Sequence, residues 1–208
     1  MISAVASCAG PPLLLPGITG RPVVEVEQLR AACLAAIAEL LASGPDQVLV
    51  VGGTSATELE PANPLSVRVG RLLLSQAAAT VPIEQLVVAE TTSTLDCLEA
   101  GRACAPSGRV GLLVVADGSA RRSVKAPGYF DERAAAFDAS IETALADGEP
   151  AGLAALDPAL AADLLVAGRA AWQLLAGATE GRRFAGRLHY SDDPFGVWYP
   201  VASWLGSQ

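Results

Sequence analysis

The sequence predicts one α/β domain over residues 1–208, in which a central, mostly parallel or mixed sheet is flanked by helices on both faces. Two observations lead to this prediction. Short, continuously apolar runs of strand length alternate with longer segments whose apolar residues recur at helical spacing. In addition, 208 residues suffice for one buried core, and neither an internal repeat nor a polar linker divides them.

The first half of the chain predicts strands and helices in alternation. Residues 24–42 place charged residues between apolar ones at helical period, and the run 43–45 (Ser-Gly-Pro) ends this helix. Residues 47–51 are an almost wholly apolar run closed by two glycines, which is typical of a buried strand. The predicted strands are 2–7, 47–51 and 85–89, and the predicted helices are 24–42, 65–78 and 93–104.

The second half opens with the clearest buried strand and closes with two more strands. Asp131 is a plausible N-cap for a helix, and Pro158 after Asp157 suits the first position of another. The tail over 184–204 alternates between polar and apolar residues. The predicted elements are a strand at 109–116, helices at 131–146, from 158 and at 169–176, and two closing strands joined around 192–194.

Three loops follow predicted parallel strands, at 8–22, 52–64 and 117–129. Because the carboxyl ends of parallel strands meet at one edge of a sheet, we expect these loops to gather there. Open α/β sheets bind their ligands at that edge. The candidate functional residues therefore lie in these loops.

Composition narrows the classes of partner. The net charge of −8 argues against nucleic acid or an anionic membrane as the main partner. The apolar N-terminal run lacks a basic region and is interrupted by prolines, so we interpret it as a core strand and not a signal peptide. No apolar run approaches the roughly 20 residues of a membrane-spanning helix.

None of the four cysteines forms a Cys-x-x-Cys pair. Because we interpret no segment as an export signal, we expect reduced thiols in a cytoplasmic protein. Cys33 lies within an apolar helical pattern and is expected to be buried. The apolar helices and the aromatic residues of 194–205 favour core or dimer contacts, so we expect a homodimer. An aromatic pocket wall is the alternative for this tail.

Residues 52–55 (Gly-Gly-Thr-Ser) are the first candidate site. No lysine follows, so this is not a P-loop, and the glycine spacing is not that of a dinucleotide-binding loop. A tight turn after the strand is the favoured interpretation. In the functional alternative, Thr54, Ser55 and their backbone N–H groups face a ligand.

The most unusual stretch is 117–122, where a buried strand ends in an acid, a glycine, a serine and two arginines. Arg121 and Arg122 suit a carboxylate or phosphate, because guanidinium groups bind such anions through paired hydrogen bonds. Asp117 and Ser119 would complete a polar pocket. A solvent-exposed loop with a surface ion pair is the equally weighted alternative.

His189 is the only histidine of the chain and precedes the acidic turn at 192–193. A lone histidine is more often structural than catalytic. Cys8 and His189 could form a thiol–imidazole pair, although nothing in the sequence brings them together. No Gly-x-Ser-x-Gly motif is present, so the sequence lacks the signature of an α/β-hydrolase.

Three stretches together resemble the class III extradiol dioxygenase subunit-B-like family, which has uncharacterised actinobacterial members and the Memo-like proteins as more distant relatives. They are CAGPPLLLPG at 8–17, VADGSARRSVKAPGYFDERAAAFD at 115–138 and LHYSDDPFGVWYPVASW at 188–204. The resemblance covers nearly the whole chain. It implies cleavage of catechol-type rings by a non-haem Fe(II) held by two histidines and a glutamate, with a further histidine as acid/base.

The positions that match the family's ligands hold other residues here. Gly10 takes the place of the first histidine, and residues 53–55 take that of the second. Ala120 or Arg121 stands at the place of the acid/base histidine, and 169–173 contain no carboxylate at the place of the glutamate. The mechanism needs three histidines and the chain has one.

Three functional hypotheses follow. The favoured one is a member of this fold that has lost its iron site, for which we expect no cofactor. It would bind an unknown small molecule, which is anionic or aromatic, or a partner protein. Its pocket would lie where 8–12, 53–58 and 117–125 converge, with Asp117, Arg121 and Arg122 as polar anchors. The second is an Fe(II) oxygenase with atypical ligands such as Asp117, His189 or a cysteine. The third is a metal-free enzyme that binds an anionic substrate through Arg121 and Arg122.

Overall fold

The computed structural model describes residues 1–55, 60, 62–104 and 108–206. Within them the chain forms a six-stranded mixed sheet in the order β3-β2-β4-β1-β6-β5. Strands β3, β2, β4 and β1 are parallel, whereas β6 runs antiparallel to β1 and to β5. The strands are β1 (Ile2–Cys8), β2 (Gln47–Thr54), β3 (Ile83–Ala89), β4 (Val110–Val115), β5 (Phe184–Asp192) and β6 (Tyr199–Gly206).

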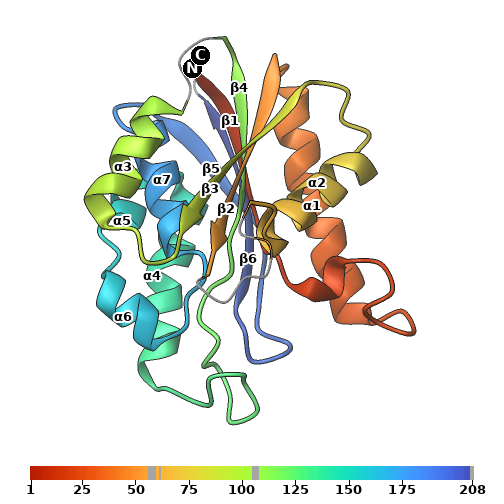
Figure 1. The fold of residues 1–208 in the computed structure, drawn as a ribbon, viewed down its shortest axis with the longest axis vertical. Coiled ribbons are helices and arrows are strands. Elements are labelled where there is room, and N and C mark those ends of the chain that lie inside the picture. Colours follow the sequence, from red (N-terminus) through yellow and green to blue (C-terminus); the bar gives the residue numbers. More distant parts are fainter. Residues whose placement is uncertain (56–59, 61, 105–107, 207–208) are drawn as a thin grey trace.

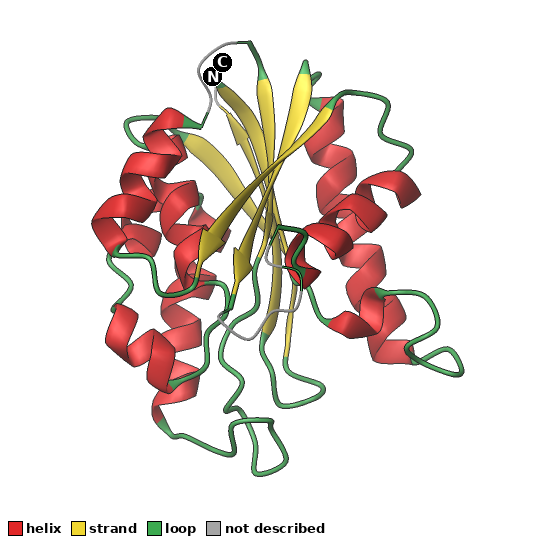
Figure 2. Ribbon diagram, in the orientation of Figure 1, coloured by secondary structure: helices red, strands yellow, loops and turns green. Residues whose placement is uncertain are grey.

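Helices cover both faces of the sheet, which confirms the predicted fold class (Figure 1). Helices α1 and α2 cover one face and the other helices cover the opposite face (Figure 2). The helices are α1 (Val24–Ala42), α2 (Leu65–Gln76), α3 (Thr94–Ala103), α4 (Arg133–Asp147), α5 (Pro150–Ala154), α6 (Pro158–Asp163) and α7 (Arg169–Thr179), with a 3-10 turn at Pro12–Leu14. No helix of the described residues combines the length and the apolar character needed to cross a bilayer.

Most predicted elements lie within a few residues of their observed bounds, and α1 matches at both ends. Two details differ. Glu132 and not Asp131 is the N-cap of α4, although the Asp131 carboxylate accepts the Arg133 N–H at 2.9 Å. Helix α5 is an additional element, opened by Glu149 and Pro150. It is too short to show a helical period, so the sequence pattern does not predict it.

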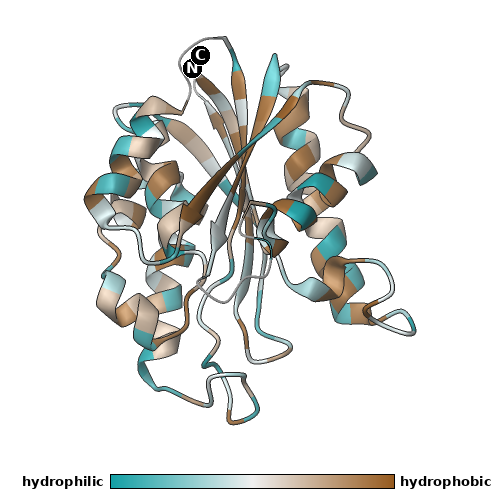
Figure 3. Ribbon diagram, in the orientation of Figure 1, coloured by the Kyte–Doolittle hydropathy of each residue, from teal (hydrophilic) through white to brown (hydrophobic). Residues whose placement is uncertain are grey.

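The core consists of two apolar layers separated by the sheet. One layer contains the three tryptophans and packs under α3, α4, α5 and α7, and the other packs under α1 and α2. Because both faces of the central strand β4 are covered, its residues are buried and apolar without alternation. Figure 3 shows brown along parts of the strands between the two helical layers. Strand β4 is buried along its whole length.

Gly52 and Gly53 do not form the predicted tight turn, because both belong to strand β2. A Cβ atom on Gly52 would lie 2.2 Å from the Ser66 Oγ. Glycine is required there because the first turn of α2 approaches the strand this closely. The strand therefore extends to Thr54, three residues beyond its predicted end.

Candidate functional site

The candidate site lies at the carboxyl ends of β1, β2 and β4. The chain leaves β1 and β2 toward α1 and α2 on one face, whereas it leaves β4 toward α4 on the other face (Figure 1). Connections that diverge in this way open a crevice at the strand ends of an α/β sheet. A cavity of about 100 Å³ occupies this crevice. We call it the strand-end cavity; it is lined by Gly10, Gly53, Leu65, Ser66, Glu90, Val115, Ala116, Asp117 and Ala167.

Asp117 is the acidic group at the centre of this site. It follows β4, and its Oδ1 accepts the backbone N–H of Gly10 at 2.7 Å, which joins the loops after β4 and β1. Burial raises the pKa of the Asp117 carboxyl to about 6, and the Gly10 hydrogen bond offsets part of that rise. Asp117 is therefore a carboxyl group that can gain or lose a proton near neutral pH.

Glycines let the backbone approach the cavity closely. A Cβ atom on Gly10 would lie 2.5 Å from the Val115 Cγ1, so a side chain there would collide with β4. On the α2 side, the Ser66 hydroxyl donates to the Gly53 carbonyl oxygen at 2.8 Å. The predicted convergence of the loops after β1, β2 and β4 is thus present in the described residues. Residues 56–59 and 61 of the second loop lie outside them.

Thr54 and Ser55 lie next to the cavity without lining it. Thr54 is the last residue of β2, and its carbonyl oxygen accepts the N–H of Glu90 at 3.0 Å. Its Oγ1 is buried and makes no hydrogen bond with any described residue. Both residues are partly buried. The functional alternative for 52–55 therefore applies to Gly53, through its backbone, and not to the two hydroxyl side chains.

Ser119 belongs to a buried network and not to the cavity. Its N–H and hydroxyl both donate to the Asp138 carboxylate, at 3.0 and 2.5 Å. Burial raises the pKa of Asp138 to about 6, against the opposing effects of Ser119 and the Arg122 charge. Arg122 lies 3.7 Å from Asp138 and 2.6 Å from Asp193. This network attaches the loop after β4 to α4 and to the turn between β5 and β6.

Neither arginine of the 117–122 stretch lines the strand-end cavity. Arg122 is used in the two ion pairs just described. Arg121 lies along its own loop, where its charge helps to lower the pKa of Asp131 and its carbonyl oxygen accepts the Asp131 N–H. Its Nε is buried and makes no hydrogen bond with the described residues. The expected polar anchors of the pocket thus reduce to Asp117.

His189 and Cys8 do not meet. The His189 Nε2 shares a hydrogen bond with the Ser203 Oγ at 2.8 Å and lies 3.5 Å from the Glu39 carboxylate of α1. Burial lowers the pKa of His189, so the ring favours its neutral form. Cys8 is fully buried beneath α1, and its contact with Cys33, together with burial, raises its pKa well above the ordinary value. Neither group reaches the strand-end cavity.

Helix α7 begins beside the cavity, and the residues just before it contribute to the cavity, although only 169–173 were considered from the sequence. Ala167 lines the cavity, and the Gly168 N–H donates to the Asp117 carbonyl oxygen at 2.9 Å. The buried Arg169 guanidinium donates to the carbonyl oxygens of Thr92, at 2.6 Å, and Glu90. Glu90 directly follows the third predicted strand, so its position at the same sheet edge could have been inferred from the sequence.

The residues at the site do not fit a non-haem iron centre. That centre needs two imidazoles and a carboxylate on one face of the metal. The described residues contain no group of three or more histidine, cysteine, aspartate or glutamate side chains that could hold a metal ion. The side chains at the cavity supply carboxylates from Asp117 and Glu90 and a hydroxyl from Ser66.

The size of the cavity also limits its ligands. A protein cavity of about 150 Å³ can hold one benzene ring. The strand-end cavity, at about 100 Å³, is smaller than that. A groove of about 610 Å³ along α6 shares Glu90 and Ala167 with it, so a larger ligand could extend outward over this groove.

Comparison with known proteins supports the fold and no more. No protein-family model matches the chain, and no curated protein is significantly similar to it. The structure is similar to the crystal structure of the uncharacterized protein JW3007 from Escherichia coli K12. The two align over 98% of this chain and 100% of that chain, with a TM-score of 0.55 and 13% sequence identity.

Proposed function

We propose that this chain is an extradiol dioxygenase subunit-B-like protein whose iron site has degenerated and whose strand-end cavity binds a small molecule without iron. One observation carries the proposal. Gly10, at the place that the resemblance gives to the first histidine, and Gly53, within the segment that it gives to the second, line one cavity together with Asp117. In this proposal the fold keeps a cavity at the strand ends, while glycine stands where the two ligand imidazoles would be needed.

Asp117 would provide the chemistry of this site. Its carboxyl group, with a pKa of about 6, accepts a hydrogen bond or a proton in one state and donates a hydrogen bond in the other. The ligand would place a polar group against Asp117 and extend along the groove beside α6. Such an arrangement is sufficient for binding and for proton transfer, and it requires no redox centre.

Two measurements test the proposal. Untagged protein, loaded anaerobically with Fe(II), is expected to take up no oxygen with a panel of catechols. Chelator-sensitive ring cleavage with stoichiometric iron would contradict the loss of the iron site.

The second measurement concerns binding. Small fragments that shift the Gly10 and Gly53 amide signals in a ¹H–¹⁵N NMR titration are expected to bind about tenfold more weakly to D117N, because one hydrogen bond to a charged group is lost. D131N is the matched control, since it removes a partly buried carboxylate of the following loop that does not line the cavity. Binding that is equal in wild type and D117N, or no fragment at these signals, would contradict the proposed site.

The other two hypotheses are less favoured. An oxygenase with atypical ligands would need Asp117, His189 or a cysteine near one another, and His189 and Cys8 are held elsewhere by Ser203 and Cys33. Anion binding through Arg121 and Arg122 would require Arg122 to leave Asp138 and Asp193. We therefore adopt neither.

A further inference from the structure

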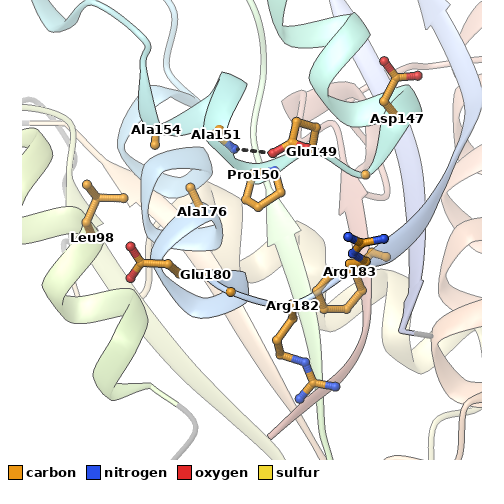
Figure 4. Close-up of a pocket in the computed structure, with 13 residues that line it drawn as sticks. Leu98, Asp147, Glu149, Pro150, Ala151, Ala154, Ala176, Glu180, Arg182 and Arg183 are labelled. Atoms are coloured by element: carbon orange, nitrogen blue, oxygen red, sulfur yellow. Dashed lines mark hydrogen bonds between the residues drawn. The ribbon is translucent and has the colours of Figure 1, made fainter. Parts of the chain in front are cut away.

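A second, larger hollow lies beside the start of β5 and the carboxyl end of α7, away from the strand-end cavity. It has a volume of about 660 Å³, within the range of about 300–1,000 Å³ that is usual for small-molecule sites. Helix α7 begins beside Asp117, and its carboxyl end, with the turn into β5, forms one side of the hollow. The other sides come from α3, the end of α4, and α5 (Figure 4).

The floor of this hollow is apolar. Phe184, the first residue of β5, is almost fully buried there and stacks on Trp204 with ring centroids 5.9 Å apart. Leu98, Pro150, Ala154 and Ala176 complete the apolar lining. Because alanine side chains are short, they leave room for the apolar body of a ligand above Phe184.

The rim of the hollow carries both carboxylate and guanidinium side chains. Two of the carboxylates are already engaged: Glu180 binds Arg102 through two hydrogen bonds, and Glu149 accepts the Ala151 N–H at 3.2 Å. Asp147 lies on the same side as Glu149 (Figure 4). Arg182 and Arg183 follow α7; in Figure 4 the Arg183 guanidinium lies below Asp147 and Glu149, and the Arg182 side chain extends further from them.

Arg182 and Arg183 form no ion pair with any described residue. The Arg182 Cζ lies 5.8 Å from the centroid of the Phe184 ring, a cation–π contact that holds its charge beside the apolar floor. The chain has 22 acidic and 14 basic residues, so carboxylates are abundant, yet among the described residues none forms an ion pair with these two cations. An external anion would satisfy them.

We propose that this hollow binds a small amphipathic anion, whose carboxylate or phosphate head faces Arg182 and Arg183 and whose apolar body lies over Phe184. Guanidinium groups bind either head through paired hydrogen bonds. The acidic side of the rim repels the head, so the ligand has one orientation. This site is independent of the function proposed for the strand-end cavity.

Isothermal titration calorimetry with octanoate and octyl phosphate tests the proposal, with octanol and octylamine as probes that lack the anionic head. At least one of the two anions is expected to bind, and the difference between them identifies the preferred head. The R182A/R183A variant is expected to weaken that binding about tenfold or more. The matched control R21A/R68A removes two exposed arginines that do not line the hollow and should change it less than about twofold.

A second variant addresses the apolar part. A151F places a bulky side chain at an exposed position of the lining and should reduce binding about tenfold without unfolding the protein. The proposal is overturned if neither anion binds at millimolar concentration, if octanol binds equally well, or if R21A/R68A weakens binding as much as R182A/R183A does.

Discussion

Asp117 links the candidate site to the stability of the whole chain. In the unfolded chain its pKa is near the ordinary value of 3.8, and in the folded chain burial raises it to about 6. The folded state therefore binds this proton more tightly. The contribution of Asp117 to stability is complete below about pH 4 and is lost as the pH rises through about 6.

The D117N variant removes this titration. We expect it to be more stable than wild type at pH 8, by about 1–3 kcal/mol, because no buried charge remains, and equally stable at pH 4. Urea unfolding at the two pH values measures the difference. An equal effect at both would show that the pKa of Asp117 is not raised by folding.

D131N is a control whose effect on stability is expected to have the opposite sign at pH 8. The Arg133 hydrogen bonds lower the pKa of Asp131 to about 2, so its contribution to stability is present above the ordinary pKa and is lost as the pH falls. We expect D131N to be less stable than wild type at pH 8 and unchanged near pH 2. The same urea titrations measure both variants.

Ser119 illustrates how a buried acid depends on one hydroxyl. Its Oγ donates to Asp138 at 2.5 Å, and both residues are buried. We expect S119A to cost about 1–3 kcal/mol at pH 8, because it leaves the Asp138 carboxylate less satisfied, and to cost less at pH 5, where Asp138 is protonated. Urea unfolding at the two pH values tests this. A loss that is larger at pH 5 would contradict it.

At the scale of elements, helices α3 and α7 pack together through glycines. A Cβ atom on Gly101 would lie 2.1 Å from the Leu174 carbonyl oxygen, and one on Gly177 would lie 2.1 Å from the Leu98 carbonyl oxygen. The helix backbones therefore touch at these two points. This contact positions α7, whose ends border both the strand-end cavity and the larger hollow.

The G177A variant tests this contact. Alanine favours an isolated helix by about 1 kcal/mol over glycine, yet we expect G177A to destabilise the protein by about 1–3 kcal/mol, because the two backbones must separate. The control G20A adds a Cβ atom that would have no other atom within 4 Å, so it should have little effect. Thermal unfolding measures both. A raised midpoint for G177A would mean that the helices are not in close contact.

At the scale of the molecule, the two apolar layers share strands β1, β2 and β4. All three tryptophans lie in the layer opposite α1. The fluorescence of the tryptophans thus reports on one face only, while circular dichroism reports on all helices. A disturbance on the α1 face reaches the tryptophans only if the two layers unfold together.

The L40A variant tests whether the two apolar layers unfold together or separately. Leu40 is fully buried in the layer under α1, and we expect its truncation to cost about 2–5 kcal/mol. The urea midpoints from fluorescence and circular dichroism should fall by the same amount. L95A, at an exposed position of α3, should shift neither. Separate midpoints in L40A would show that the layers unfold independently.

The sequence alone predicted most of the helices and strands, though not α5, and the edge of the sheet where the candidate site lies. Helix α1 was predicted at its observed bounds because its period and the Ser-Gly-Pro run after it are local signals. Asp117 was found because a buried strand ending in an acid is also a local pattern. Because the carboxyl ends of parallel strands lie at one edge of a sheet, the loop that contains Asp117 was expected at that edge.

Contacts between distant segments determined the rest. Arg122 was predicted to face the cavity, but its position depends on Asp138 and Asp193 from two other elements. His189 shares a hydrogen bond with Ser203 of β6 and lies 3.5 Å from Glu39 of α1. Gly52 and Gly53 suggested a turn because glycine often marks turns. Gly52 instead leaves room for Ser66 of α2, and Gly53 lies close to Ala167, and both neighbours come later in the chain. Local patterns set backbone conformation, whereas side-chain partners depend on packing between elements remote in sequence.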